Sequence, residues 1–348
     1  MLLNWYFMKT KISKIFNVLI IGAGSIGALR DAPNSEKILS HAHAFLGCNG
    51  FNLIGFLDID KGKAEYAANL WGGRAFSSYE VVFSVYKIDV VIVAVPDDFH
   101  YLVLKQISQF PIKFVFAEKP FTKNVNEAKE IITLYRNKGI SIAVNHSRRF
   151  VPEFEKIKNE ISSGLYGEYL SGTGYYGKGI LHNGSHMIDF LMYFLGEVKS
   201  KSIVCGDYDF YDDDPSVAAV LWFKNNRPFY LQTIDCKLHT TFEVDFMFEK
   251  KRIRIVDFGM KIELYDILDN SIFKGHRNAV KVDEIETSHD KNMYFAAKNI
   301  YGYLSKNEKL SCTAHDAYKV MCECCELKDM FQTRHDFNRS IKESECSI

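Results

Sequence analysis

Residues 17–27 read Asn-Val-Leu-Ile-Ile-Gly-Ala-Gly-Ser-Ile-Gly, an apolar run followed by Gly22, Gly24 and Gly27. A Gly-x-Gly-x-x-Gly spacing directly after a strand is typical of a turn that holds a dinucleotide. The first glycine permits the tight turn, the second lets the backbone approach a pyrophosphate, and the third lets the next helix pack closely. Backbone N–H groups of Ser25 and Ile26 would then face the phosphates. A turn without function can show the same pattern, so the surrounding sequence has to decide.

A carboxylate at the end of the second apolar run supports the cofactor interpretation. Asp58 directly follows residues 51–57, where it can accept hydrogen bonds from both ribose hydroxyls and would repel a 2′-phosphate. The sequence therefore favours NAD over NADP. The gap between the glycines and Asp58 is longer than the usual ~20 residues. We expect the extra segment, 30–40, to form a loop up to Ser35, after which residues 36–46 resume the first helix.

The two halves of the chain have different patterns. Apolar runs at 89–95, 112–117 and 140–144, separated by helical segments such as 126–138, predict a parallel sheet covered on both faces. Six strand candidates between 198 and 266, with a turn at Asn225-Asn226, predict an antiparallel sheet. The fold class is therefore α/β: an N-terminal Rossmann doubly wound parallel sheet plus a C-terminal α+β domain with an open, mostly antiparallel sheet. The expected divisions are an N-terminal extension (1–16), the NAD(P)-binding domain (17–146), the α+β domain (147–332, with helices in 292–330) and a polar tail (333–348).

Composition excludes several classes of protein. A chain of 348 residues suggests two domains at roughly 100–200 residues each. Lys+Arg and Asp+Glu both total 43, which argues against binding of nucleic acid or an anionic membrane. The 8 cysteines are scattered, and no apolar stretch reaches the ~20 residues of a membrane span, so we expect a cytoplasmic protein. Residues 1–8 lack the basic start of a secretory signal, and Met8 is an alternative first residue.

Four further motifs follow in order along the chain: Val95-Pro96-Asp-Asp-Phe-His100, Glu118-Lys119-Pro120, Asn145-His-Ser-Arg-Arg149-Phe-Val-Pro152 and Gly184-Ser-His186-Met-Ile-Asp189. From about residue 17 to 330 this series resembles the Gfo/Idh/MocA family, which includes glucose–fructose oxidoreductase and inositol dehydrogenase. The resemblance implies an NAD-dependent oxidoreductase acting on a CH–OH group of a sugar, sugar derivative or nucleotide-linked sugar. It also implies a homodimer or homotetramer formed through the C-terminal sheet. The cofactor contacts that it implies beyond the glycine turn are Val95, Pro96, His100, Glu118 and Lys119.

Two residues are candidates for moving charge during the reaction. Lys119 follows the carboxyl end of a predicted strand, where ligands collect in parallel sheets. The resemblance implies that it contacts the nicotinamide ribose and the reacting oxygen, where its cation would stabilise an oxyanion. The resemblance gives His186 the role of general acid/base, for which an ordinary pKa near 6.5 is suited. The alternatives are a surface lysine and a helix-start histidine that bonds a backbone carbonyl.

The sequence departs from the family pattern one turn before His186. The family has an aspartate four residues earlier, and this chain has His182. A carboxylate would raise the basicity of His186, whereas a second imidazolium would repel the first. His182 can therefore bind substrate, share the proton or do neither. We expect no metal at His182, His186 and Asp189, because Gly184 interrupts the helix and Asn183 replaces the glutamate of zinc-binding helices.

Several polar residues are candidates for substrate contacts. Asn145 and Arg149 could reach sugar hydroxyls or a phosphate, and Asp189 a hydroxyl, unless it orients a neighbour. Lys178, within the segment 175–179, could meet an anionic group while the tyrosines there stack on a sugar; a plain turn is the alternative. The missing aspartate also leaves two other functions open. One is a glycosidase or lyase that retains its NAD without net redox change, and the other is a non-catalytic cofactor- or sugar-binding sensor.

Overall fold

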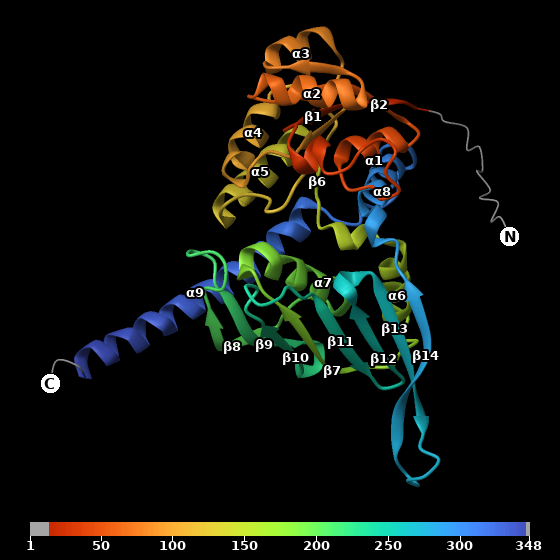
Figure 1. Ribbon diagram of the computed structural model, residues 1–348, viewed down its shortest axis with the longest axis vertical. Coiled ribbons are helices and arrows are strands. Elements are labelled where there is room, and N and C mark those ends of the chain that lie inside the picture. Colours follow the sequence, from red (N-terminus) through yellow and green to blue (C-terminus); the bar gives the residue numbers. More distant parts are fainter. Residues whose placement is uncertain (1–13, 346–348) are drawn as a thin grey trace.

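The computed structural model describes the backbone of residues 14–345 and the side chains of residues 14–336. The alternative start Met8 and most of the expected extension, 1–16, lie outside the described residues. The described chain forms two sheets, each with its own helices, and a long C-terminal helix passes between them (Figure 1). Within the described part, no helix is long and apolar enough to cross a membrane.

The first sheet has six parallel strands in the order β3-β2-β1-β4-β5-β6, as predicted for a Rossmann domain. Its strands are β1 (Phe16–Ile21), β2 (Phe51–Leu57), β3 (Arg74–Phe76), β4 (Val90–Val93), β5 (Phe114–Ala117) and β6 (Ser141–Val144). Every residue of β4 and β5 is buried, because helices cover both faces of the sheet. This burial explains why these strands are apolar throughout and do not alternate.

Helices on the two faces come from both ends of the chain. They are α1 (His41–Gly47), α2 (Lys61–Trp71), α3 (Tyr79–Val85), α4 (His100–Ile107), α5 (Val125–Lys138) and α8 (Asn292–Lys306). We expected α8 to lie in the second domain. Its buried residues Met293, Ala296 and Ile300 instead belong to the core that α1 shares with the first sheet. The chain therefore returns to the Rossmann sheet after completing the second one.

The glycine turn leads into a short π-helix, η1 (Ser25–Leu29), and α1 begins only at His41. The expectation that a helix resumes at residue 36 is therefore wrong. The carboxylate of Asp31 holds the intervening chain by accepting hydrogen bonds from Leu39 N (2.7 Å) and from the Ser40 hydroxyl. Ser40 in turn caps α1 by accepting a hydrogen bond from the backbone N–H of His43.

The second sheet has eight strands in the order β14-β13-β12-β11-β7-β10-β9-β8. All of its pairs are antiparallel except β10 with β7, so the mostly antiparallel sheet is confirmed. The predicted turn at Asn225-Asn226 is also confirmed, with φ of 61° and 55° at the two asparagines. The strands are β7 (Tyr169–Tyr176), β8 (Ser200–Asp207), β9 (Ser216–Phe223), β10 (Arg227–Thr233), β11 (Glu243–Phe248), β12 (Lys251–Val256), β13 (Lys261–Asp269) and β14 (Arg277–Glu286). The sequence did not predict β7 or β14.

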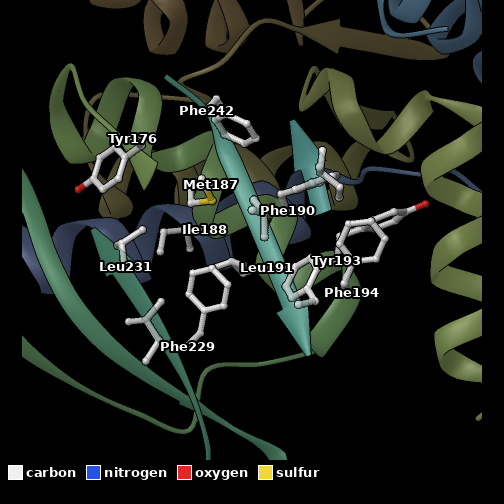
Figure 2. Close-up of a cluster of buried hydrophobic side chains, with 14 of the residues drawn as sticks. Tyr176, Met187, Ile188, Phe190, Leu191, Tyr193, Phe194, Phe229, Leu231 and Phe242 are labelled. Carbon is white, nitrogen blue, oxygen red and sulfur yellow. The ribbon is translucent and has the colours of Figure 1, made fainter. Parts of the chain in front are cut away.

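Three helices pack on one face of this sheet: α6 (Pro152–Ser162), α7 (Ser185–Leu195) and α9 (Ala314–Glu345). The apolar side of α7, which includes Met187 and Leu191, meets Phe229 and Leu231 of β10 (Figure 2). The start of α9 packs on the first sheet through Ala317, and its next turns join the core of the second. The expected polar tail, 333–348, is helical as far as Glu345.

Candidate active site

The three glycines after β1 have different surroundings. A Cβ on Gly22, whose φ is +96°, would lie 2.3 Å from the carbonyl oxygen of Ala94, and one on Gly27 would lie 2.0 Å from the Gly22 oxygen. A Cβ on Gly24 would meet no atom within 4 Å. The first and third glycines therefore permit close packing of the chain. The second faces open space, as the close approach of a pyrophosphate requires.

Asp58 lies beside this turn. One of its carboxylate oxygens accepts a hydrogen bond from Ala23 N (2.7 Å) and the other accepts one from Asp60 N (2.9 Å). The residue is half-buried, so the carboxylate still has lone pairs directed at solvent. The open face at Gly24 and the adjacent Asp58 fit the pyrophosphate and ribose of NAD.

A buried histidine side chain holds the turn after β4 in place. His100 is fully buried, and its Nε2 lies 2.9 Å from the carbonyl oxygen of Val95. This contact places Val95 and Pro96 at the sheet edge next to Gly22, whose missing Cβ makes room for Ala94. We expected His100 to touch the cofactor. The structure instead buries it under the turn that would do so.

Lys119 follows β5 and is half-buried. Its ammonium forms no hydrogen bond or ion pair with any residue whose side chain the structure describes, 14–336. Burial lowers the pKa of Lys119, while the carboxylates of Glu118 and Asp97 oppose the shift and Lys178 reinforces it. An ammonium in this position is available to a ligand, because its desolvation has not been offset by a direct partner.

Glu118 is tied into the first domain by two neighbours. Its Oε1 lies 2.7 Å from Nε2 of His41 and accepts a 2.7 Å hydrogen bond from the side-chain amide of Asn145. Burial alone would raise the pKa of Glu118, but these hydrogen bonds and the charge of Lys119 outweigh it and lower the pKa. Asn145, expected to contact substrate, therefore holds Glu118 in this structure.

Two more of the expected substrate residues pair with each other. Nε of Arg149, in the short helix η3 (Ser147–Phe150), donates a 2.8 Å hydrogen bond to Asp189 of α7, and both residues are buried. Nη1 of Arg149 also lies 3.4 Å from Asp316 of α9. The three charged groups join three helices, and neither Arg149 nor Asp189 lines the cavity described next.

A cavity of about 440 Å³ opens at the carboxyl ends of β4 and β5. Segments associated with both sheets form its wall. They are the turns after β4 and β5, the segment before α7, the loop 208–215 and α9. The residues with functional groups on this wall include Asp97, Lys119, His146, His182, Tyr211 and Cys325. Such a position, outside the carboxyl ends of the strands, is where ligands bind in open α/β sheets.

His186 lies in the first turn of α7, with its ring centroid 6.1 Å from that of His146. Its ring nitrogens form no hydrogen bond with the side chains described in 14–336 or with the backbone of 14–345. Burial and then the positive charges of Lys119 and Arg148 lower the pKa of His186 well below its ordinary value. At neutral pH the ring is therefore uncharged.

No aspartate stands four residues before His186 in this chain. The residue at that position, His182, instead has a carboxylate partner of its own. It lies in a π-helix, η4 (Gly179–Gly184), and its Nδ1 is 2.7 Å from Oδ2 of Asp214 in the loop 208–215. The ring stacks on Tyr211 at 3.9 Å between centroids and 18° between planes. Asp214 is buried and also accepts hydrogen bonds from the backbone N–H groups of Leu181 (3.0 Å) and His182 (3.1 Å).

The remaining candidates lie at the edge of this region. Lys178 has a left-handed backbone (φ 70°), donates its N–H to Asp209 (2.7 Å) and places its ammonium 4.4 Å from the Phe210 ring centroid. The idea that the tyrosines before it stack on a sugar is wrong for Tyr176, which is fully buried with its hydroxyl bonded to the Val217 oxygen. Lys178 therefore lies beside the cavity but is not one of the residues that line it.

Sequence reasoning missed two functional candidates that the structure shows. Tyr211 lines the cavity, and Arg148 is buried with its guanidinium 3.7 Å from the Phe242 ring centroid. Nη2 of Arg148 donates a hydrogen bond to the Phe258 carbonyl (3.3 Å). Arg148 could have been found from its position beside Arg149. Tyr211 could have been found because it belongs to an aromatic pair in an acidic loop.

Residues 16–146 match the family model described as an oxidoreductase family with an NAD-binding Rossmann fold, GFO_IDH_MocA. These residues are therefore similar to the NAD-binding domain of the Gfo/Idh/MocA oxidoreductases. This chain is also similar to inositol 2-dehydrogenase of Corynebacterium glutamicum, with 28% identity over 165 residues (47% of this chain, 46% of the relative). D-glucoside 3-dehydrogenase of Escherichia coli is 24% identical over 258 residues, 64% of this chain and 70% of that one. The chain spans about half the length of the first curated relatives it matches.

The fold is shared along nearly the whole chain. A solved structure of UDP-N-acetylglucosamine 3-dehydrogenase from Acidithiobacillus ferrooxidans superimposes with a TM-score of 0.71 and 15% identity, covering 91% of this chain and 98% of that one. The two-domain architecture implied by the motif series is therefore confirmed.

Proposed function

We propose that this protein is an NAD-dependent oxidoreductase that transfers a hydride between nicotinamide and a hydroxyl or keto carbon of a sugar, sugar derivative or nucleotide-linked sugar. The observation that carries the proposal is Lys119, an ammonium without a direct partner among the described side chains, on the wall of a cavity of about 440 Å³. That cavity lies at the sheet edge where Gly24 and Asp58 fit NAD. The sugar-type substrate is supported by the names of the relatives, which are dehydrogenases of inositol and of a glucoside.

Two side chains have separate roles in the proposed reaction: one stabilises negative charge and the other transfers a proton. Lys119 donates a hydrogen bond to the reacting oxygen and stabilises the negative charge that develops there. A neutral histidine near this oxygen takes the hydroxyl proton when an alcohol is oxidised and returns it in the reverse direction. The family resemblance implies His186 for this role. When bound, NAD supplies the nicotinamide carbon that accepts or donates the hydride.

The assembly proposed from the family resemblance is a homodimer or homotetramer through the outer face of the second sheet. Tyr230 of β10, the third strand from one edge of the sheet, is 48% exposed on this face, and Trp222 of β9 is half-buried. An exposed aromatic side chain in mid-sheet is typical of a surface that meets a partner. Light scattering at a series of concentrations tests this: Tyr230→Glu is expected to shift the mass toward the monomer, and an unchanged mass would exclude this face.

Two linked measurements test the proposed activity. Fluorescence titration is expected to show tight NADH binding and weak NADPH binding, and addition of NAD with myo-inositol, methyl glucoside or UDP-N-acetylglucosamine is expected to form NADH. Turnover of a glycoside without net NADH would instead support the NAD-retaining glycosidase or lyase. Cofactor binding with no isotope exchange from any of these sugars would support the sensor. If neither nucleotide binds and the denatured protein releases none, the proposal fails.

A further inference from the structure

We infer that His182, held by Asp214, is the group that accepts the substrate proton, and that His186 is not. The inference rests on the proposed function and assigns the proton step within it. It departs from the role predicted for His186 from the sequence. Three observations carry it: the partner of each histidine, the exposure of each ring to the cavity and the charges around each ring.

Asp214 fixes the tautomer of His182. Its carboxylate accepts backbone hydrogen bonds from Leu181 and His182, and these hold it in place beside the ring. A buried carboxylate 2.7 Å from Nδ1 requires a proton on that nitrogen. Nε2 of His182 is then the unprotonated nitrogen, with its lone pair free to accept a proton. The stack on Tyr211 holds the plane of the ring.

The ring of His182 can also be reached by a substrate. Its side chain is 31% exposed and lines the same cavity as Lys119, whereas Asp214 behind it is 2% exposed. A carboxylate that is buried on one side of an imidazole, with the opposite side open to a ligand, is the arrangement by which proteins position a histidine for proton transfer. His186 does not line this cavity.

The surroundings of His186 oppose a positive charge. After burial, the largest effects on the pKa of His186 come from Lys119, Arg148, His146 and His289, and each of them lowers it. An imidazolium at His186 would therefore lie near the cations of Lys119 and Arg148, whereas an imidazolium at His182 would lie against Asp214. The other titratable groups that share the cavity wall with His182 are Asp97, Asp98, Lys119, Lys123, His146, Tyr211, Asp213, Cys324, Cys325 and Lys328.

The step balances with the components already proposed. The O–H bond of the substrate alcohol breaks, and its proton goes to Nε2 of His182 to give an imidazolium paired with Asp214. The C–H bond of the carbon that bears this hydroxyl also breaks. Its hydrogen leaves with the electron pair as a hydride for the nicotinamide, so the carbon becomes a carbonyl. Lys119 stabilises the oxygen meanwhile. The imidazolium later releases the proton to water. Asp214 is a positioning residue, because it acts only through His182.

Nitrogen-15 NMR of the histidine rings tests the tautomer without any substrate. In the protein with NAD, the neutral form of His182 is expected to carry its proton on Nδ1 and to leave Nε2 bare. Asp214→Asn should change the His182 signals. Asp209→Asn is a matched control, since Asp209 lies in the same loop and binds backbone N–H groups of Lys178 and Cys236 without touching His182. A proton on Nε2 of His182, or equal effects of the two variants, would overturn the inference.

Kinetics with the reactive sugar then separate this inference from the proposed function. His182→Gln is expected to lower kcat by about 100-fold or more, as for loss of a general base, with NADH affinity retained. His186→Gln should lower kcat by less than about tenfold. In Asp214→Asn we expect a reduced kcat with little change in KM, because the carboxylate no longer holds the ring of His182 in its position and tautomer.

Two outcomes would contradict the assignment. If His186→Gln abolishes turnover while His182→Gln retains it, the proton passes through His186 and the proposed oxidoreductase stands. If both histidine variants keep full turnover while Lys119→Met loses it, neither histidine carries the proton. If Lys119→Met also keeps full turnover, the proposed role of Lys119 is wrong, and the oxidoreductase activity still stands.

Discussion

Asp214 and His182 are 32 residues apart in the chain, yet the carboxylate of one lies 2.7 Å from the ring nitrogen of the other. In the family pattern this segment carries its own aspartate. In this protein the loop before β9 supplies a carboxylate to the same segment. Because Asp214 also binds the backbone of that segment, it holds the π-helix and the ring together. One buried side chain therefore fixes both the local backbone and the tautomer of His182.

A pair of glycine substitutions separates fold from cofactor binding. Gly24→Ala adds a methyl group that meets no protein atom within 4 Å, so we expect a change in stability within ~0.5 kcal/mol and at least tenfold weaker NADH binding. Gly22→Ala places its methyl 2.3 Å from the Ala94 oxygen at a φ of +96°, so we expect a much lower melting temperature. Equal NADH affinity in Gly24→Ala and the native protein would show that no phosphate approaches this turn.

Asp58 is expected to set both the affinity and the choice of nicotinamide cofactor. Asp58→Ser removes a charged acceptor of ribose hydroxyls, a loss of roughly 1.5–3 kcal/mol, which corresponds to at least about tenfold weaker NADH binding. NADPH binding should fall less or improve, since the repulsion of the 2′-phosphate is removed. Asp60→Ser is the control, because serine can replace Asp60 as the cap of α2. An unchanged ratio of NADH to NADPH affinity would contradict the placement of Asp58.

The buried Arg149–Asp189 pair is expected to stabilise the protein more than it serves the substrate. Arg149→Met leaves Asp189 buried with one charged partner fewer, and we expect the free energy of unfolding to fall by about 3–5 kcal/mol. Glu130→Gln, which breaks the exposed pair with Lys105, should change it by less than about 1 kcal/mol. Chemical denaturation of both variants measures the difference. A stable Arg149→Met protein with a greatly raised KM for sugar would restore Arg149 as a substrate ligand.

Stability is expected to fall as the pH drops below about 6.5, the ordinary pKa of histidine. Burial lowers the pKa values of His146, His186 and His289, to about 3 in the case of His289. Below pH ~6.5 the unfolded chain therefore binds protons that the folded protein refuses, and each ring costs up to about 1.4 kcal/mol per pH unit. Melting temperatures measured between about pH 7.5 and pH 5 should decrease, with a smaller slope in His289→Gln. A slope unchanged by that substitution would show that His289 binds protons when folded.

Local patterns predicted the first sheet and its cofactor edge well. The glycine spacing, the apolar β4 and β5 and the carboxylate at Asp58 each depend on neighbouring residues, so the sequence displays them directly. The start of α1 was predicted wrongly because Asp31, 12 residues before His43, decides it by binding the loop and the cap. The family pattern supplied Lys119 and His186, whose roles stay predictions.

The partners in the site could not be predicted because they depend on contacts between distant segments. Four aspartates, Asp209 and 212–214, lie in one loop, and no local signal shows which of them meets His182. Asn145 and Arg149 suit a substrate chemically, but each has a protein partner that is 27 or 40 residues away. Only the folded arrangement distinguishes a side chain that binds its neighbour from one that waits for a ligand.

Lys119→Met offers the most direct test of the proposed chemistry. The substitution keeps the length of the side chain and removes the charge, so NADH binding, measured by fluorescence, is expected to stay within a few-fold of the native value. NADH formation from the sugar that the native protein oxidises is expected to fall by about 100-fold or more, because the oxyanion loses its donor. Full NADH formation by Lys119→Met would contradict the account.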